Sequence, residues 1–353
     1  MEQAALFEIR KNQTTRCLAC CHYCMLNPGS IGVCGTRINR DGILYSLVYG
    51  NIVGPAIDPV EKKPLNHFLP GSTLLSFGTL GCNFGCLFCQ NDWMSQATKI
   101  SNKQISNKQI EIERTISRLS RKATPEELID RAISSGSAGI AYTYNEPAIF
   151  VEFAYDVMKR AKKNGLKNVF VSNGYESGET FAYIKDYLDA INIDLKSFRP
   201  EFYRNLCKAS IEPVKENIKR YFNIGIETEV TTLVIHGYND SCEELTDIAK
   251  FLALISLDIP WHVSAFSPAY KMVNVPPTPA KSVIKAWEIG KKAGLRYVYT
   301  GNIDSDKHVD TVCPTCSALL VERRGYNTIL KHINLSTGAC KSCHTKIYGV
   351  WKI

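Results

Sequence analysis

Three cysteines in one short segment have the spacing of ligands to a metal cofactor. They are Cys82, Cys86 and Cys89 in the stretch "GCNFGCLFCQ". A [4Fe–4S] cluster contains four irons, and each iron takes one ligand from outside the cluster. Three thiolates therefore leave one iron open to a substrate or a second cofactor. The alternative is a zinc site whose fourth ligand comes from elsewhere in the chain.

A second cysteine group lies near the carboxyl end. It consists of two C-x2-C pairs separated by a segment that predicts a strand-rich hairpin, namely Cys313, Cys316, Cys340 and Cys343. Paired thiols of this kind are typical of a zinc ribbon. Rubredoxin-like iron is the main rival. We expect a structural role, because small cysteine-rich modules fold around their metal.

A third cysteine group, near the amino end, has one thiol more than a four-ligand site needs. The segment "RCLACCHYC" and the later "VCG" supply five thiols. We expect the ligands of a second metal or cluster to be Cys17, Cys20, Cys24 and Cys34. Cys21 or His22 could substitute, an additional iron–sulfur cluster is one alternative, and ligands shared between the two ends of the chain are another.

The two remaining cysteines stand alone in the sequence. Cys207 and Cys242 have no cysteine neighbours at ligand spacing. We expect both to be small buried hydrophobic residues, since an isolated free cysteine usually packs in a core.

The composition excludes several classes of protein. The chain has 353 residues, 45% of them hydrophobic and 22% charged, with a formal charge of +8. Thiolates bound to metal would cancel much of that charge, so nucleic acid is an unlikely partner. The sequence has no apolar run long enough to span a membrane and no signal-peptide core near its start. We therefore expect a cytoplasmic protein, and we expect its 14 cysteines to bind metal rather than form disulfides.

Strand-like and helix-like segments alternate from about residue 72 to 300. The predicted strands are 73–79, 138–144, 168–173, 190–195, 226–234, 261–266 and 296–301. The predicted helices between them are 124–136, 147–165, 178–188, 212–225, 241–256 and 278–294. Repeated strand–helix units predict an α/β fold with a parallel sheet, as a partial (β/α)6-type TIM barrel, with a doubly wound sheet as runner-up. The three-cysteine segment follows the first strand, where the active sites of barrels lie.

The alternation of strands and helices predicts a division into three parts. Residues 1–71 are a cysteine-rich extension with a connecting loop, 72–304 the barrel, and 305–353 a zinc-ribbon-like module. Residues 54–72 contain four prolines and predict an ordered connecting loop. Residues 100–122 contain a tandem "ISNKQ" repeat. We interpret that segment as a mobile insertion, with a substrate or partner loop as the alternative.

The C-x3-C-x2-C motif after the first strand resembles that of the radical S-adenosylmethionine (SAM) superfamily. The resemblance implies that a reduced cluster cleaves SAM bound to its open iron. The product is a 5′-deoxyadenosyl radical, which abstracts hydrogen from a substrate. It also implies that Phe88 lies where the adenine of SAM is held.

Four later segments resemble SAM-binding motifs of the same superfamily. In "YNEP" the resemblance assigns Asn145 and Glu146 to the methionyl amino group, although the usual glycines are absent. In "VSNG" it assigns Ser172 and Asn173 as hydrogen-bonding residues. The remaining assignments are Asp194 and Lys196 in "DLK", for the methionyl amine and carboxylate, and His262 in "WHVSAF", for the ribose.

Nearly the whole chain resembles the radical SAM member of the AmmeMemoRadiSam system, which is related to pyruvate formate-lyase activating enzymes. The segments "DPVEKKPLNHFLPGS", "GTLGCNFGCLFCQN", "NIDLKSF", "VPPTP" and the terminal "CPTC…CKSC" carry this resemblance. It implies protein partners of the AMMECR and Memo types and an electron donor of flavodoxin or ferredoxin type. Ala265, where a basic residue is expected, and Cys21, where a proline is expected, depart from the pattern.

Three functions remain open at this point. The first is radical modification of a substrate together with AMMECR- and Memo-type partners. The second is activation of a glycyl-radical enzyme, as pyruvate formate-lyase activating enzymes do. The third is a non-catalytic, metal-stabilised binding protein, which would require the motif of Cys82, Cys86 and Cys89 to be degenerate.

Overall fold

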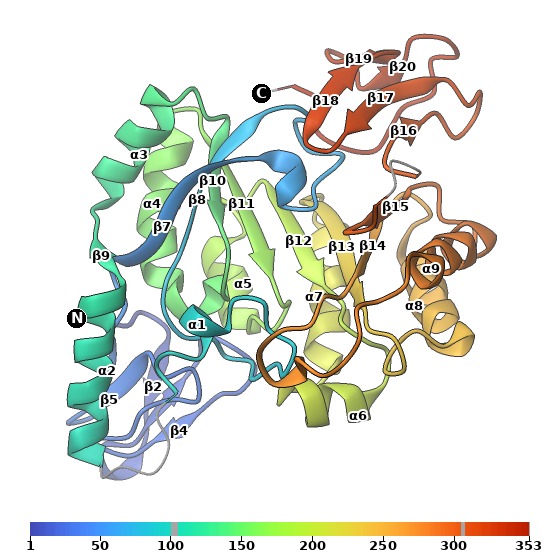
Figure 1. Ribbon diagram of the computed structural model, residues 1–353. Coiled ribbons are helices and arrows are strands. Elements are labelled where there is room, and N and C mark those ends of the chain that lie inside the picture. The colour runs from blue at the N-terminus through green and yellow to red at the C-terminus, as the bar shows by residue number, and fades with distance from the viewer. Residues whose placement is uncertain (100–104, 305–307, 353) are drawn as a thin grey trace. The chain divides into compact units, whose positions relative to one another are not determined.

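Strands alternate with helices in both of the units into which the chain divides (Figure 1). The structure, a computed structural model, describes residues 1–99, 105–304 and 308–352. The first unit comprises residues 1–57, 75–189 and 207–209, and the second comprises 58–74, 190–206 and 210–353.

The first unit carries two small amino-terminal sheets and most of the strand–helix units that precede residue 190. Its elements are β1 (Glu2–Gln3), β2 (Phe7–Ile9), β3 (Thr15–Cys17), β4 (Met25–Leu26), β5 (Arg37–Arg40), β6 (Ile43–Ser46), β7 (Asn51–Pro59), β8 (Thr73–Gly78), α1 (Asp92–Ser95), α2 (Ile105–Leu119), β9 (Arg121–Lys122), α3 (Pro125–Ser134), β10 (Gly139–Tyr142), α4 (Val151–Lys163), β11 (Lys167–Ser172) and α5 (Gly178–Ile184). The last residues of β7 and the first of β8 fall in the second unit.

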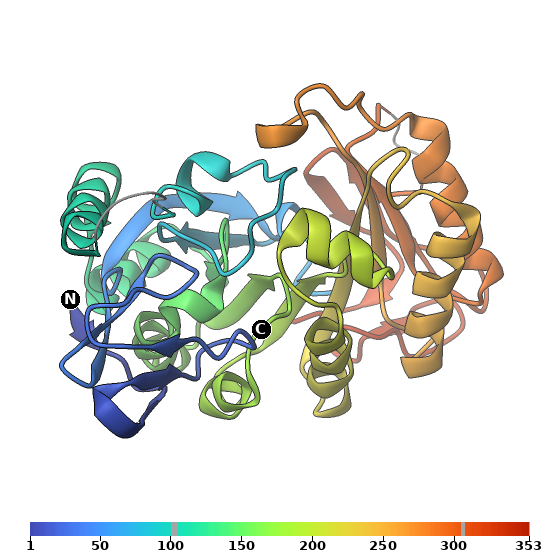
Figure 2. The same cartoon turned by 90° about the horizontal axis from the view of Figure 1, so that it is seen from below.

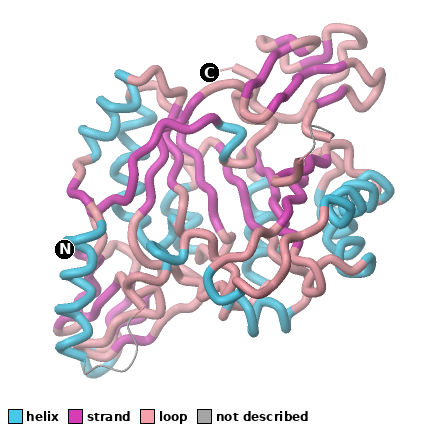
Figure 3. The backbone as a smooth tube through the Cα atoms, viewed as in Figure 1, coloured by secondary structure: helices cyan, strands magenta, loops and turns pink. Residues whose placement is uncertain are grey.

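The main sheet of the first unit runs in the order β11-β10-β8-β7-β9 (Figure 3). β10 pairs with β11 in parallel, whereas the short β9 pairs with β7 antiparallel. Every residue of β10 is buried, as expected for a strand covered on both faces. Helix α3 begins with a capping box in which Thr124 and Glu127 satisfy each other's backbone N–H groups. Helices α3 and α4 pack against each other.

The second unit contains four parallel strands in the order β15-β14-β13-β12. Its elements are β12 (Ala190–Asp194), α6 (Pro200–Phe202), α7 (Glu212–Asn223), β13 (Glu227–Val234), α8 (Cys242–Ile255), β14 (Trp261–Ala265), α9 (Ala280–Lys292) and β15 (Val298–Gly301). Figure 2 shows the gold and orange helices α8 and α9 side by side along these strands. Gly290 of α9 allows this packing, because a Cβ there would lie 2.9 Å from the Trp261 ring.

Short strands form the cysteine-bearing module at the carboxyl end of the second unit. They are β16 (Thr311–Val312), β17 (Leu319–Arg324), β18 (Asn327–Leu330), β19 (Ile333–Asn334) and β20 (Ala339–Cys340). β17 and β18 form the predicted hairpin. The core of the module includes Tyr297 and Tyr299, which belong to the barrel-type strand β15 and the residue before it. The module is therefore packed on the end of that strand.

The predicted α/β class with a mostly parallel sheet is confirmed, and each predicted strand and helix between residues 72 and 301 is present within four residues of its expected bounds. The expectation of a loop over 54–72 is wrong for residues 54–59, which belong to β7. The three-part division stays a prediction. Among the described residues, none of the helices is both long and apolar enough to cross a membrane.

One further expectation needs correction, and one helix was not predicted. Helix α2 covers Ile105–Leu119, including the second "ISNKQ" copy, while the interpretation of 100–122 as a mobile insertion stays a prediction. The first copy, 100–104, lies outside the described residues. Cys207 is buried as expected, but Cys242 is exposed, since it occupies the first position of α8. A residue in the first turn of a surface helix has little neighbouring chain to cover it.

Candidate functional site

The three-cysteine loop leaves the end of β8 through a tight turn at Gly81. Gly81 has φ +89°, and a Cβ there would lie 2.5 Å from the Thr36 side chain and 2.7 Å from the Cys34 carbonyl oxygen. Only glycine fits both the left-handed backbone and this close approach. The sequence therefore fixes the point at which the loop turns toward its three thiols.

Hydrogen-bond donors approach the sulfurs of this loop. The backbone N–H of Phe84 donates to Cys82 Sγ at 3.4 Å, and Ser95 Oγ lies 3.2 Å from Cys89 Sγ. Burial raises the pKa of the Cys82 thiol, and the positive charge of Lys99 opposes that rise. A buried thiolate here thus needs a strong positive partner. Iron supplies one, so the donor set fits a cluster bound through three cysteines.

Asn145 holds the beginning of the cysteine loop in place. Its Nδ2 donates to Thr79 Oγ1 at 3.1 Å and to the Gly81 carbonyl at 2.8 Å, while its Oδ1 accepts from the Thr79 N–H. Tyr144, the residue before it, has φ +71°, in the region that favours glycine. The backbone of "YNEP" thus adopts a glycine-like turn without a glycine.

Glu146 lies in a fully buried hydrogen-bond network with the other residues predicted on this side. Its carboxylate accepts from the Asn173 N–H at 2.8 Å and the Ala148 N–H at 3.0 Å. Ser172 Oγ lies 3.1 Å from both Glu146 oxygens and 2.6 Å from Glu176 Oε1. Burial, reinforced by the negative charge of Glu176, raises the pKa of Glu146 to about 8. In this arrangement Glu146 fixes the loop that follows β11.

Two residues of this network were not predicted from the sequence. Glu176 shares the Ser172 hydroxyl with Glu146, and Asn83 Oδ1 accepts from Asn173 Nδ2 at 2.7 Å. Asn83 lies beside Cys82 in the chain, and Glu176 lies two residues after the "VSNG" segment. Asn83 thus lies inside one predicted motif and Glu176 close after another, and this proximity was the only signal available. Phe88 is buried within the same unit.

In the second unit, Asp194 and His262 lie in one row across three strands. Asp194 of β12 pairs in register with Thr231 of β13, and Thr231 pairs with His262 of β14. Residues in register point to the same face, so the two side chains are two strand spacings, about 10 Å, apart on that face. Lys196 Nζ lies 2.8 Å from Asp194 Oδ2, and this ion pair is partly exposed.

His262 is bonded to a buried acid that the sequence analysis missed. Its Nε2 lies 2.6 Å from Glu229 Oε2, and Glu229 Oε1 accepts from the His67 N–H at 2.7 Å. Although burial alone would raise it, the pKa of Glu229 is lowered by the hydrogen bond from His262. Burial, with the neighbouring charge of Glu229, raises the pKa of Glu227. The acids at alternate positions of the buried strand "ETEVTT" were the available signal, because alternate residues share a face.

The four carboxyl-terminal cysteines come together in the second unit. Cys313 Sγ lies 3.5 Å from Cys343 Sγ, Cys316 Sγ lies 3.7 Å from Cys340 Sγ, and all four sulfurs lie within 4.8 Å of one another. A tetrahedral ion with metal–sulfur bonds of about 2.3 Å puts its ligand sulfurs about 3.8 Å apart. The spacing therefore fits a single tetrahedral ion, zinc or iron. The pKa of Cys343 is lowered to about 6, and the largest cause is its hydrogen bond with the Thr345 hydroxyl.

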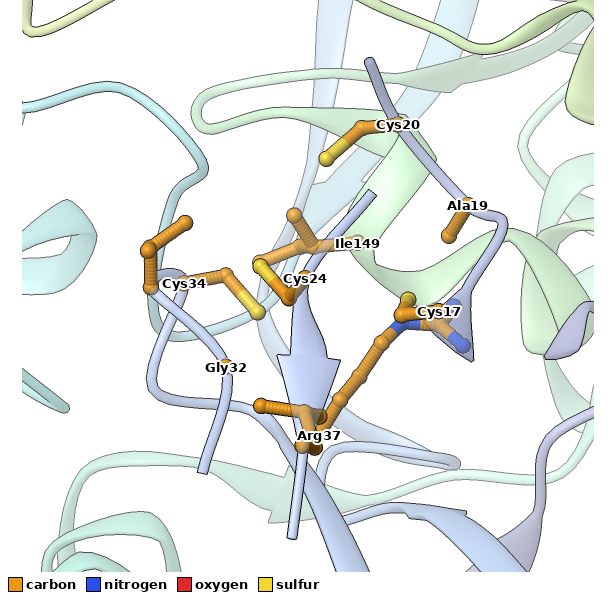
Figure 4. A pocket seen from close by; sticks show the side chains of 10 residues that line it. Cys17, Ala19, Cys20, Cys24, Gly32, Cys34, Arg37 and Ile149 are labelled. Carbon is orange, nitrogen blue, oxygen red and sulfur yellow. The ribbon is translucent and has the colours of Figure 1, made fainter. Parts of the chain in front are cut away.

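The four amino-terminal cysteines that we favoured line one cavity of the first unit (Figure 4). Cys17, Cys20, Cys24 and Cys34 share it with Arg37 and Ile149, among others. Cys21 is not among the lining residues, and its thiol donates to the Glu176 carbonyl at 3.2 Å. Metal binding by these four cysteines stays a prediction. So does SAM binding by the residues assigned to it from the sequence.

The chain is similar to known proteins in sequence and in fold. The sequence profile described as the radical SAM superfamily matches residues 77–252. An uncharacterized protein from Methanocaldococcus jannaschii is 38% identical over 348 residues, which is 98% of this chain and 99% of that protein. The 4-hydroxyphenylacetate decarboxylase activating enzyme of Clostridium scatologenes is 26% identical over 126 residues, 34% of this chain and 39% of that enzyme.

Activating enzymes for pyruvate formate-lyase are also similar. The one from Clostridium pasteurianum is 21% identical over 173 residues, 49% of this chain and 66% of that enzyme. Among solved structures, a domain of the pyruvate-formate lyase-activating enzyme from Bacteroides vulgatus matches with a TM-score of 0.40 and 20% identity, over 47% of this chain and 100% of that one.

Proposed function

Because the chain belongs to the radical SAM superfamily, we propose that it binds a [4Fe–4S] cluster through Cys82, Cys86 and Cys89 and uses SAM to abstract hydrogen from a substrate. The observation that carries this proposal is the loop itself. Three thiols, two of them with hydrogen-bond partners, follow the first barrel-type strand within one tight segment. When bound, the cluster and SAM would together supply a 5′-deoxyadenosyl radical.

The surrounding residues would position the cofactor. Asn145 fixes the loop at Thr79 and Gly81, so the three sulfurs keep their spacing. Asp194 and Lys196 have the charges needed to bind the methionyl ammonium and carboxylate of SAM. We propose that His262, oriented by Glu229, contacts the ribose.

Further contacts to SAM complete the proposal. Phe88, buried next to Cys89, would lie against the adenine. Asn145, Glu146, Ser172 and Asn173 are proposed as contacts near the methionyl amino group. The Glu146 carboxylate already accepts hydrogen bonds from the Asn173 and Ala148 N–H groups. Its proposed role is therefore to position the backbone around the methionyl amino group of SAM.

The decisive experiment measures SAM cleavage by the anaerobically reconstituted protein. Incubation with dithionite and SAM is expected to release 5′-deoxyadenosine, and Cys86→Ala is expected to lose the product together with the share of the iron–sulfur absorbance that belongs to this cluster. Cys242→Ala is the matched control, because Cys242 is an exposed cysteine outside every cysteine group. No 5′-deoxyadenosine from protein with a full complement of iron and sulfide would sink the proposal.

The proposed biological setting comes from the sequence resemblance to the AmmeMemoRadiSam system. In this setting the protein acts with partners of the AMMECR and Memo types and receives electrons from a flavodoxin- or ferredoxin-type protein. The clustered ligand thiols favour the reducing cytoplasm as the compartment. Affinity purification of the tagged protein under anaerobic conditions tests this setting. Absence of AMMECR- and Memo-type proteins from the purified material, with the cluster intact, would contradict it.

Activation of a glycyl-radical enzyme is the second candidate function. It is favoured by the similarity to the activating enzymes of 4-hydroxyphenylacetate decarboxylase and pyruvate formate-lyase. A glycyl radical on a partner enzyme gives a characteristic electron paramagnetic resonance (EPR) doublet. Co-incubation with a glycyl-radical enzyme from the same organism, SAM and reductant should produce that doublet. Its absence would leave radical modification of another substrate as the function.

We also propose a single zinc or iron ion at the carboxyl-terminal cysteines, with a structural role. The close spacing of the four sulfurs supports this proposal. The predicted parts 1–71, 72–304 and 305–353 remain our proposed division by function: a cysteine-rich extension, the SAM-binding barrel and the metal-bearing module.

A further inference from the structure

We propose that Cys17, Cys20, Cys24 and Cys34 bind a second iron–sulfur cluster, held in the first unit and independent of the radical reaction. The four residues come from different elements of the amino-terminal region. Cys17 ends β3, Cys20 and Cys24 lie in the turn between β3 and β4, and Cys34 precedes β5. Their side chains line one cavity, as Figure 4 shows. The fold thus gathers four thiols from 18 residues of sequence.

The spacing of the sulfurs distinguishes this site from a single-ion site. In the part of the chain that the structure describes, the carboxyl-terminal thiols are the one group of three or more ligand atoms that could hold a single metal ion, and their sulfurs lie within 4.8 Å of one another. The four amino-terminal thiols do not form such a group. A single ion needs its ligand sulfurs about 3.8 Å apart. A cluster tolerates wider spacing, because its thiolates bind different irons.

Arg37 supplies a second, independent observation. Its side chain is 2% exposed and lines the same cavity. Nη1 and Nη2 donate to the two carboxylate oxygens of Glu152 at 2.9 Å and 2.6 Å. The third nitrogen, Nε, is buried and has no hydrogen-bond partner. A buried N–H without an acceptor is costly, and the sulfur of a metal-bound thiolate or a bridging sulfide would accept its hydrogen bond.

Another donor is already directed at one of the sulfurs. Thr36 Oγ1 donates to Cys34 Sγ at 3.1 Å, and both atoms are buried. Gly32 leaves room beside two of the sulfurs, since a Cβ there would lie 3.7 Å from Cys34 Sγ and 3.9 Å from Cys24 Sγ. Hydrogen bonds to cluster sulfurs are one of the means by which proteins set reduction potentials.

The structure also selects among the five amino-terminal cysteines. Cys21 donates its thiol hydrogen to the Glu176 carbonyl, and His22 Nε2 lies 2.9 Å from the Asn83 carbonyl oxygen. Neither residue lines the cavity. Cys21 is therefore the matched control for Cys20, because the two are adjacent and differ in whether they line the cavity.

The site lies next to the loop that begins at Gly81. The Cys34 carbonyl accepts from Thr98 Oγ1 at 3.0 Å, and it is the atom that a Cβ on Gly81 would meet at 2.7 Å. A substitution at Cys34 could therefore disturb Cys82, the next residue of that loop. The test needs a background in which the radical SAM cluster is absent and a separate measurement in which it is present.

The first measurement uses the triple variant Cys82→Ser/Cys86→Ser/Cys89→Ser. Anaerobic reconstitution should leave about two or four irons per chain matched by equal acid-labile sulfide, as for a cysteine-ligated [2Fe–2S] or [4Fe–4S] cluster, in addition to the single zinc or iron ion of the carboxyl-terminal cysteines. Adding Cys20→Ser, Cys24→Ser or Cys34→Ser should remove them, while adding Cys21→Ser should not. A folded triple variant without sulfide, or with zinc that the Cys24→Ser addition removes, would overturn the proposal. Loss of the iron when Cys21→Ser is the one substitution added to the triple variant would also overturn it.

The second measurement uses the intact protein, so it does not depend on the variants folding. Dithionite-reduced protein should show two EPR components. One should change when SAM is added, as expected for the cluster with an open iron. The other should not change, because all of its irons have protein or sulfide ligands. If every spin responds to SAM, the second cluster is absent. If neither component responds, the proposed SAM reaction fails while the second cluster stands.

Discussion

The cysteine loop of the first unit and the four-cysteine module of the second use the same residue in opposite ways. In the module, four sulfurs lie within 4.8 Å of one another and can enclose one ion completely. In the loop, Cys82, Cys86 and Cys89 offer three thiols, one fewer than the four outside ligands that a [4Fe–4S] cluster takes, and we propose that they bind such a cluster. A closed ligand shell leaves no position for a substrate, whereas an open one does.

The side chains around the two sites also differ, apolar around the module and polar around the loop. The module is packed around an apolar core that includes Leu320, Ile333 and Trp351. The loop is held by polar side chains, including Asn145, and by the network of Glu146 and Ser172. An apolar surround keeps a structural metal in place. A polar surround orients a site that must accept a charged cofactor.

The strongest test of this comparison disrupts each cysteine site in turn and measures the metal bound at both. Cys340→Ala should release the carboxyl-terminal metal, and Cys86→Ala should release the loop iron, each leaving the other metal in place. The binding energy of a structural zinc site is roughly 10 kcal/mol or more, so the module should lose its fold without its metal. Metal analysis together with hydrogen exchange in β17 and β18 measures both effects. Unchanged zinc and iron in Cys340→Ala would refute the closed site.

A smaller effect is expected from the charges proposed to bind SAM. Asp194→Asn removes a charged acceptor, whose hydrogen bond is worth about 1.5 to 3 kcal/mol, so SAM should bind roughly 10- to 100-fold more weakly. Iron content should not change. Asp258→Asn is the control, because Asp258 pairs with Arg296 in the same unit. Equal SAM affinity in the two variants would contradict the role of Asp194.

The pH dependence of stability should report on the polar surround of the loop. Because burial raises the pKa of Glu146 from 4.5 to about 8, the unfolded chain loses this proton at lower pH than the folded chain does. The unfolded state then binds fewer protons, so the free energy of unfolding should fall as pH rises from about 4.5 to 8, and level off above that.

Glu146→Gln should flatten this fall by an amount on the order of 1 kcal/mol or more. Urea unfolding of both proteins at several values between pH 5 and 9 measures the slope. Identical slopes would show that Glu146 is ionised in the folded protein. Hydrogen exchange in β17 and β18 should not respond to the substitution.

The smallest effect is expected at an exposed cysteine that lies outside the three cysteine groups. Cys242 is exposed at the start of α8, so Cys242→Ala should change the free energy of unfolding by less than about 0.5 kcal/mol. Iron, sulfide and zinc contents should equal those of the unmodified protein. A loss of any of the three would mean that a cysteine outside the groups contributes to a metal site.

The sequence predicted the strand–helix alternation well, because buried parallel strands are continuous apolar runs and helices begin at Ser, Thr or Pro caps. Superfamily membership, predicted from C-x3-C-x2-C, is confirmed by the profile match. The helix α2 was missed, since the tandem "ISNKQ" repeat, whose second copy begins the helix, resembles a low-complexity insertion. Cys242 was placed wrongly, because exposure depends on neighbours that a single position does not reveal.

The amino-acid sequence by itself determined the three groups of cysteines and the order of the motifs along the chain. Spacing of two or three residues between thiols is a local property, and it survives whatever the distant chain does. Only the tertiary structure separated Cys20 from Cys21, since adjacent residues point to different surroundings. In the folded chain His262 is hydrogen-bonded to Glu229, and Arg37, whose Nε is buried without a partner, lines a cavity with four cysteines. These relations join residues far apart in sequence, and only the packing of the folded chain brings them together.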